Sequence, residues 1–177
     1  VRGAVSSDSG QITQAASFDG TGSDFVEVPD DHSLGITGPY TQTAWVYINT
    51  SAGFKDITLK DPGQWAFGFQ ITGQKLRAGW EDEADNNYIG RGGSVPVETW
   101  THVAVVYSGD AVRGYIDGAE VFDVTRASDG SGIAVADATP STNDEPLRIG
   151  KGERAFDGRI DDLRLYNRAL SDPDVTE

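Results

Sequence analysis

Residues Phe156–Ser171 read Phe-Asp-Gly-Arg-Ile-Asp-Asp-Leu-Arg-Leu-Tyr-Asn-Arg-Ala-Leu-Ser, and they predict a β-strand with an acidic residue on its apolar face. Leu163 and Leu165 share parity with Asp161, and side chains two residues apart on a strand lie on the same face. If that face meets the core, Asp161 needs a cation, several hydrogen-bond donors or a raised pKa.

The tripeptide that opens this stretch also occurs near the N-terminus, as Phe18-Asp19-Gly20, and Asp24 follows it. Two terminal segments that meet around clustered carboxylates would form a calcium clasp, because calcium prefers oxygen ligands from carboxylates and backbone carbonyls. The alternative is that Asp161 caps a turn or pairs with Arg159 or Arg164. The predicted calcium ligands are Asp19, Gly20, Asp24, Asp161 and Asp162.

The length and composition predict one domain over residues 1–177, with enough chain to bury a large core. Cysteine is absent, so neither a disulfide framework nor a zinc-thiolate site can form. No apolar run approaches the ~20 residues that span a bilayer, and no signal peptide is evident. Because the chain starts at Val1 and lacks methionine, we interpret it as a mature or excised domain of a longer protein.

The net charge of −14 comes from an excess of aspartate over few lysines. Such a surface would repel nucleic acid and anionic membranes at long range, so it argues against both as partners. It is compatible with calcium, with neutral glycans and with a high-salt environment, where screening weakens self-repulsion. The alternative is that the acidic excess serves only solubility.

Short hydrophobic segments separated by Asp-Gly, Gly-Ser and Asp-Pro predict an all-β sandwich or barrel. Val103–Val106 do not alternate, which indicates a strand buried on both faces. Asp117-Gly118 predicts a hairpin, residues 128–143 a long loop, and Ala169–Val175 at most one helical turn. The predicted strands are Ala15–Phe18, Asp24–Val28, Tyr40–Ile48, Asp56–Lys60, Trp65–Ile71, Lys75–Trp80, Trp100–Tyr107, Ala111–Ile116, Glu120–Thr125, Pro146–Ile149 and Gly158–Tyr166.

Several of these segments, in this order, resemble the laminin-G-like jelly roll of the concanavalin A-like lectin/glucanase superfamily. The resemblance rests on Phe18–Pro29, Thr43–Val46, Trp100–Tyr107, Tyr115–Gly118, Leu147–Gly150 and Phe156–Ser171. It implies a two-sheet antiparallel β-sandwich, often with a structural calcium where the terminal strands meet. It also implies a sugar-binding or adhesion module of a secreted or cell-surface protein, although a fold by itself does not determine function.

The tryptophans divide into two groups. Trp45 and Trp100 occupy core-strand positions of the family, so we predict that they pack in the core. Trp80 ends a predicted strand and opens a polar loop, where an aromatic face beside amides and arginines would suit a sugar. The alternative is a half-buried tryptophan beside a solvated acidic loop. The predicted ligand-binding residues are Trp80, Tyr88, Asn86, Asn87, Arg77 and Arg91.

The sequence shows no catalytic motif. Glycosidases of this superfamily carry paired carboxylates on one strand, whereas the dense acidic run Glu81–Asp85 lies in a predicted loop. His102 falls within a predicted buried strand, where a hydrogen-bonded core histidine is expected, and His32 lies in a turn. We therefore predict a non-enzymatic, calcium-stabilised module that binds a glycan or polysaccharide, beside other domains of its parent protein. The alternatives are a structural or protein-interaction module and, third, a polysaccharide-cleaving enzyme.

Overall fold

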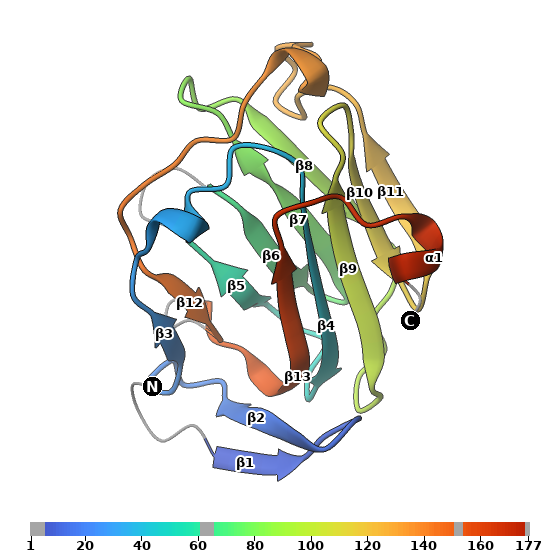
Figure 1. The fold of residues 1–177 in the computed structure, drawn as a ribbon. Helices are drawn as coiled ribbons and strands as arrows, with labels where there is room; N and C mark the ends of the chain where they lie inside the picture. The colour runs from blue at the N-terminus through green and yellow to red at the C-terminus, as the bar shows by residue number, and fades with distance from the viewer. Residues whose placement is uncertain (1–5, 61–65, 151–153, 176–177) are drawn as a thin grey trace.

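The computed structural model describes residues 6–60, 66–150 and 154–175, which form two antiparallel β-sheets packed face to face (Figure 1). One sheet contains β1 (Ser6–Ser9), β2 (Gln14–Asp19), β4 (Tyr40–Ile48), β9 (Thr101–Tyr107), β10 (Val112–Ile116), β11 (Ala119–Val124) and β13 (Asp157–Tyr166). The other contains β3 (Val26–Val28), β5 (Phe54–Leu59), β6 (Gly68–Thr72), β7 (Lys75–Glu81), β8 (Asn87–Gly92) and β12 (Leu147–Ile149). The predicted sandwich is confirmed.

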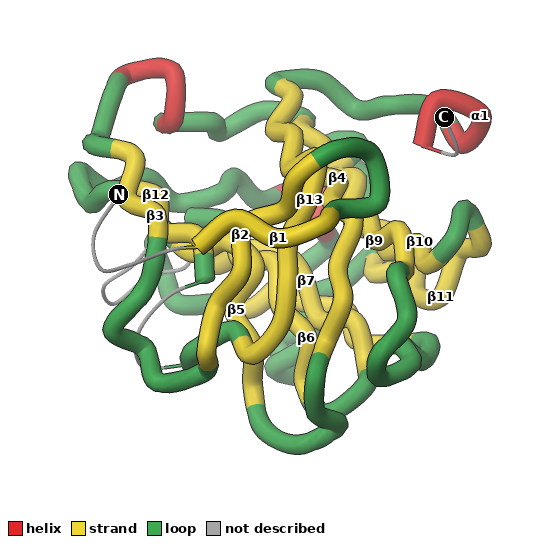
Figure 2. Tube along the Cα trace, turned by 90° about the horizontal axis from the view of Figure 1, so that it is seen from below, coloured by secondary structure: helices red, strands yellow, loops and turns green. Residues whose placement is uncertain are grey.

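The strand order shows that the chain crosses repeatedly between the two sheets. The seven-stranded sheet runs β1-β2-β13-β4-β9-β10-β11, and the six-stranded sheet runs β3-β12-β5-β6-β7-β8. The β1–β2 hairpin lies nearest the viewer when the molecule is seen from below (Figure 2), which is the lower end of the sandwich in Figure 1. Strand β13 therefore sits between β2, close to the N-terminus, and the central strand β4.

Most predicted strands are present, and two strands are additional. The bounds of β4 agree with the prediction, and the Asp117-Gly118 hairpin joins β10 to β11 with both residues at positive φ. The sequence analysis missed β1 and β8; it assigned the start of β8 to a polar loop. Trp65, the start of the predicted strand that corresponds to β6, lies outside the described residues.

Strand β9 is buried on both faces, as its unbroken apolar run predicts. Val103 and Val105 belong to the core between the sheets. Ala104 and Val106 face outward, but Leu170 and Val175 of the C-terminal segment cover them. Val175 ends the one-turn helix α1 (Asp172–Val175), and no helix in the described part of the chain is long and apolar enough to cross a membrane.

A β-bulge in β13 reverses the predicted orientation of Asp161. The pairing of β13 with β4 shifts between Asp161 and Arg164, where Asp162 adopts a φ of 48°. An extra residue at a bulge switches the parity of the strand, so Ile160 and Leu165 contact the core while Asp161 faces outward. Our parity argument was therefore wrong: it assumed an uninterrupted strand.

Asp161 is nevertheless only 8% exposed, because the turn between β1 and β2 lies over it. Its carboxylate accepts hydrogen bonds from the backbone N–H groups of Ile12 and Asp162, each at 2.8 Å. A Cβ on Gly10 would come within 2.4 Å of Asp161 Oδ2, which shows how closely the turn approaches. The carboxylate thus binds a turn, which is the alternative role considered for it above.

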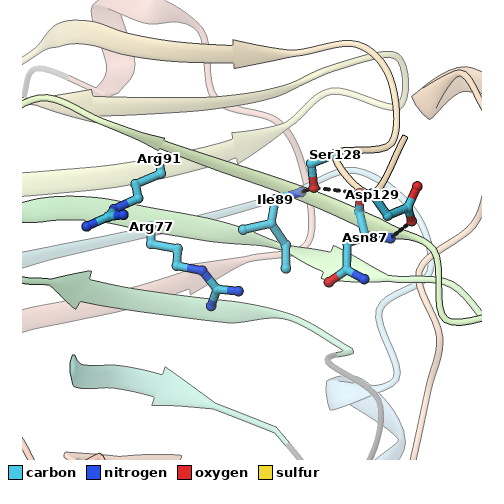
Figure 3. A pocket seen from close by; sticks show the side chains of 6 residues that line it. All are labelled: Arg77, Asn87, Ile89, Arg91, Ser128 and Asp129. Carbon is cyan, nitrogen blue, oxygen red and sulfur yellow. Dashed lines mark hydrogen bonds between the residues drawn. The ribbon is translucent and has the colours of Figure 1, made fainter. Parts of the chain in front are cut away.

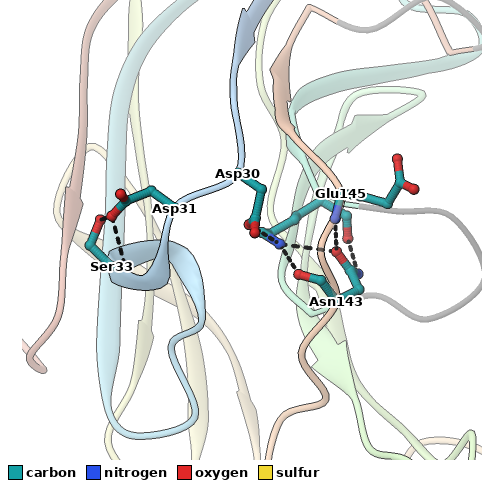
Figure 4. A network of polar contacts seen from close by, with 6 residues as sticks. Asp30, Asp31, Ser33, Asn143 and Glu145 are labelled. Atoms are coloured by element: carbon teal, nitrogen blue, oxygen red, sulfur yellow. Dashed lines mark hydrogen bonds and ion pairs between the residues drawn. The ribbon is translucent and has the colours of Figure 1, made fainter.

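A buried lysine anchors the long loop that precedes β12. Figure 4 shows its partners Asp30 and Asn143. The side chain of Lys60 is fully buried, and its Nζ lies 2.9 Å from Asp30 Oδ1 and 3.0 Å from Asn143 Oδ1. Lys60 also donates to the backbone carbonyl of Asn143. A buried charge is tolerated when an opposite charge and hydrogen bonds compensate it, so this network ties the end of β5 to two loops.

Candidate functional site

The aromatic platform predicted at Trp80 does not reach the surface. Trp80 and Tyr88 are both 0% exposed, and their rings stack on each other with centroids 4.1 Å apart. Trp80 also contacts Tyr107 of the facing sheet. Neither ring can offer a face to a sugar, so the assignment of these two residues to a ligand site is corrected: they form part of the core.

Trp45 and Trp100, which we expected in the core, are half-buried on the outer face of the seven-stranded sheet. Trp45 meets the edge of His102, at a centroid distance of 5.4 Å. The guanidinium of Arg159 lies 3.9 Å from the ring centroid of Tyr47 and 5.4 Å from that of Trp100. We call Tyr47, Trp100 and Arg159 the aromatic patch. Trp45, Trp100 and Trp80 thus have the opposite burial to that predicted, and Trp45 takes an outward position in the alternation along β4.

The polar residues of the predicted constellation do come together, on the outer face of the six-stranded sheet (Figure 3). They line an open pocket of about 320 Å³, which we call the β8 pocket. Its lining residues are Arg77, Asn87, Ile89, Arg91, Ser128 and Asp129. Three of these were predicted. Ile89, Ser128 and Asp129 were missed, and Asn86 lies in the preceding turn.

The outward positions of four neighbouring strands form a polar row that leads into this pocket. Asp56, Gln70, Arg77 and Arg91 are in register across β5, β6, β7 and β8. Asp56 and Gln70 are fully buried, whereas Arg77 is half-buried and Arg91 is exposed. The row therefore runs from a buried carboxylate to an exposed guanidinium.

Hydrogen bonds along this row orient Arg77. Its Nη1 donates to Gln70 Oε1 at 2.7 Å, and Gln70 Nε2 donates to Asp56 Oδ1. Burial lowers the pKa of Arg77, and nearby Arg154 and Arg91 act in the same direction, while Glu81 and Asp56 oppose them. The guanidinium stays charged at any physiological pH, since an arginine pKa lies far above that range.

The opposite wall of the pocket is held by contacts between β8 and the loop after β11. Asn87 N–H donates to Asp129 Oδ2 at 2.7 Å, and Ser131 N–H donates to Asp129 Oδ1 at 2.8 Å. These bonds lower the pKa of Asp129. Ser128 Oγ accepts from Ile89 N–H and donates to the carbonyl of Asn87. Figure 3 shows the arginines at one end of the pocket and Asp129 at the other.

The turn before β8 is acidic, and hydrogen bonds to Asp82 hold it together. The carboxylate of Asp82 accepts hydrogen bonds from the backbone N–H groups of Ala84 and Asn86 and from the side chain of Asn86. Asp82 also accepts from the hydroxyl of Tyr88 at 3.2 Å. Asn86 is therefore a structural residue of the turn, and it directs the chain into β8.

Two glycines allow β8 to pack closely on the facing sheet. A Cβ on Gly90 would lie 2.1 Å from the ring of Phe122, and one on Gly92 would lie 2.1 Å from the carbonyl of Val121. Strand β8 therefore uses its inward positions for Tyr88 and glycine, and its outward positions for Asn87, Ile89 and Arg91. This alternation is the sequence signal that could have identified the strand.

The predicted calcium ligands do not converge at one point. Asp19 pairs with Asp157 on β13, four residues from Asp161, which at ~3.3 Å per residue is about 13 Å along the strand. Asp24 accepts from the N–H of Asp19, whereas Asp162 forms an ion pair with Arg164 at 2.9 Å. Among the described residues, no group of three acidic or histidine side chains is placed to hold a metal.

Comparisons with known proteins agree with this architecture. The family model of the concanavalin A-like lectin/glucanases superfamily matches residues 19–176, so the chain belongs to that superfamily. No curated protein matches it.

Solved structures share the fold at low sequence identity. The binding domain of Paraclostridial Mosquitocidal Protein 1 aligns with a TM-score of 0.81 and 14% identity, over 99% of this chain and 45% of that one. Domain 4 of AbnA, an extracellular arabinanase from Geobacillus stearothermophilus, was solved with arabinotriose. It aligns with a TM-score of 0.73 and 23% identity, over 98% of this chain and 80% of that one. The CBM40 of the Ruminococcus gnavus IT-sialidase, bound to α2,3-sialyllactose, aligns with a TM-score of 0.64 and 12% identity. The alignment covers 86% of this chain and 95% of that one. The chain spans less than half the length of the first of these domains.

Proposed function

We propose that this domain is a non-catalytic carbohydrate-binding module of a secreted or cell-surface protein, and that the β8 pocket is its binding site. The observation that carries the proposal is the pocket itself. It combines two guanidiniums, an amide, a hydroxyl, a carboxylate and the apolar side chain of Ile89 on one sheet face. Such a set can donate to and accept from the hydroxyls of a sugar while the apolar group contacts its C–H surface.

Two further observations support binding without catalysis. The similar structures solved with arabinotriose and with sialyllactose show that this fold can present sugar sites. Glycoside hydrolysis needs two carboxylates on either side of the bond, whereas Asp129 is the single acidic residue among the described residues that line the β8 pocket. Because backbone amides hold Asp129 and lower its pKa, it would also be a poor general acid.

A binding panel tests this proposal. We expect at least one polysaccharide from a neutral and acidic panel to bind in calorimetry or affinity electrophoresis. Asn87→Ala should weaken that binding about 2- to 10-fold, the usual effect of losing one neutral hydrogen bond. Asn49 follows the end of β4 in the other sheet, so its side-chain amide lies away from the pocket. Asn49→Ala is therefore the matched control and should leave binding unchanged. Equal losses in both variants would contradict the pocket assignment.

The aromatic patch favours a second candidate function. Tyr47 and Trp100 present half-buried rings beside Arg159 on the outer face of the seven-stranded sheet. Aromatic and arginine side chains are enriched at protein interfaces, so this face supports a structural or protein-interaction module. If no glycan of the panel binds the domain, this second function becomes the better account.

We also propose that calcium stabilises the fold, on the basis of the family resemblance. Of the predicted ligands, Asp19 and Asp24 remain together at one corner of the sandwich. A cation that binds only the folded state raises the unfolding temperature by mass action. We therefore expect a lower melting temperature in EDTA than in calcium, measured at equal ionic strength with magnesium as the control; superimposable curves would refute the proposal.

A further inference from the structure

Two arginines lie directly opposite each other in the β8 pocket. Arg77 on β7 and Arg91 on β8 are register partners, and both face outward. Directly opposed residues on antiparallel strands have Cβ atoms about 5 Å apart, and like charges in such a pair destabilise a sheet. The arrangement is the more unusual because the whole chain carries a net charge of −14.

The two guanidiniums are supported in different ways. Arg77 is half-buried and is oriented by the Gln70–Asp56 hydrogen-bonded pair next to it in the same row. Arg91 is exposed and donates to the backbone carbonyl of Thr72 at 3.3 Å. Arg154 adds a third positive charge that lowers the pKa of Arg77, while the carboxylates of Glu81 and Asp56 act in the opposite direction. One end of the pocket thus presents two guanidiniums, of which that of Arg77 is held by a side-chain hydrogen bond.

The other end of the pocket offers hydrogen-bond acceptors. Asp129 lies away from the arginines (Figure 3), and its carboxylate is held by the backbone amides of Asn87 and Ser131. A ligand that spans the pocket would therefore place an anionic group at the arginines and hydroxyl donors near Asp129. An arginine binds a carboxylate or sulfate oxygen pair with two parallel hydrogen bonds.

We propose that the β8 pocket selects acidic sugars, with a carboxylate or sulfate group held between Arg77 and Arg91. This inference rests on the proposed function, since it names the ligand class of the same site. An anion between the two guanidiniums offsets their repulsion. The long-range field of the acidic protein does not favour such a ligand, so the selectivity arises at contact distance within the pocket.

Matched pairs of oligosaccharides test the proposal by calorimetry on the full chain. The pairs are 3′-sialyllactose against lactose, trigalacturonate against galactotriose, and a sulfated galactan oligosaccharide against its desulfated form. We expect the acidic member of at least one pair to bind about 10- to 100-fold more tightly, as one or two charge-assisted hydrogen bonds provide. The first two pairs report carboxylate recognition and the third reports sulfate recognition.

Three variants locate the effect. Arg91→Gln should remove most of the preference for the acidic sugar, and Arg91→Lys should restore only part of it, because lysine lacks the planar pair of donors. Arg113→Ala removes one positive charge from β10 of the other sheet, where Arg113 lies near Glu120 and Asp123, and should change nothing. Because Arg91 is exposed, its variants should melt within a few degrees of the parent.

The outcomes distinguish failure of the acidic selectivity from failure of carbohydrate binding itself. Equal affinity for both members of every pair would overturn acidic selectivity and leave carbohydrate binding intact. Absence of binding to every sugar would overturn carbohydrate binding as well. Equal losses in Arg91→Gln and Arg113→Ala would show an effect of net charge, and would contradict the assignment to the arginine pair.

Discussion

The substitution Trp80→Ala should lower the stability of the whole domain, and it should not act selectively on ligand binding. Trp80 is fully buried and stacks on Tyr88, and its ring also contacts Tyr107 of the facing sheet. Truncating a core tryptophan to alanine removes apolar contacts and leaves a cavity, which costs about 3–5 kcal/mol. For a domain of this size the melting temperature should fall by about 10 °C or more.

The measurement is denaturant unfolding followed by circular dichroism, with Trp80→Phe as the control. Phenylalanine keeps an aromatic ring against Tyr88. It also removes Trp80 Nε1, which is buried without a hydrogen-bond partner among the described residues. Trp80→Phe should therefore lose much less stability than Trp80→Ala. If Trp80→Ala kept the stability of the parent but no longer bound glycan, the result would contradict the core position of Trp80. It would support the surface role first predicted for this tryptophan.

Gly158→Ala should be comparably damaging, because β13 approaches the backbone of β4 at this residue. Gly158 has a φ of 146°, and a Cβ there would lie 2.0 Å from the carbonyl oxygen of Tyr47. A backbone atom cannot rotate away as a side chain can, so β4 or β13 must shift. The steric clash and the strained φ together should cost about 3 kcal/mol or more.

Gly38→Ala provides the matched control for this substitution. A Cβ on Gly38 would meet nothing within 4 Å, so this variant should unfold within about 1 kcal/mol of the parent. The comparison is again by denaturant unfolding. If Gly158→Ala were as stable as Gly38→Ala, the close approach between β13 and β4 would be wrong, and with it the pairing that places Phe156–Asp157 beside β2.

The sequence was sufficient to predict the fold because its strands follow strong local rules. β4 and β9 contain β-branched and aromatic residues bounded by glycine, proline and aspartate, and the Asp117-Gly118 turn has the residues that a tight hairpin requires. The orientation of Asp161 was not predictable from parity, because it depends on the bulge at Asp162. Nor could local sequence reveal that the turn between β1 and β2 would cover that carboxylate.

Only three of the residues that line the candidate site were predicted from the sequence. Arg77, Asn87 and Arg91 were named, but β8 was missed, because its asparagine and glycine residues have low strand propensity. Ser128 and Asp129 reach the pocket through hydrogen bonds to β8 from about 40 residues away along the chain, and no local pattern signals such a contact. Trp80 was assigned to the surface because β8, whose Tyr88 stacks on its ring, was not recognised as the neighbouring strand.

The most direct test of the account is a nuclear magnetic resonance titration of the labelled domain with the tightest-binding oligosaccharide of the panel. The β8 pocket predicts that the largest amide shifts occur on β7 and β8 around Arg77 and Arg91 and in the loop at Ser128 and Asp129. Largest shifts at Tyr47 and Trp100, on the other sheet, would contradict the pocket and move the binding site to the aromatic patch.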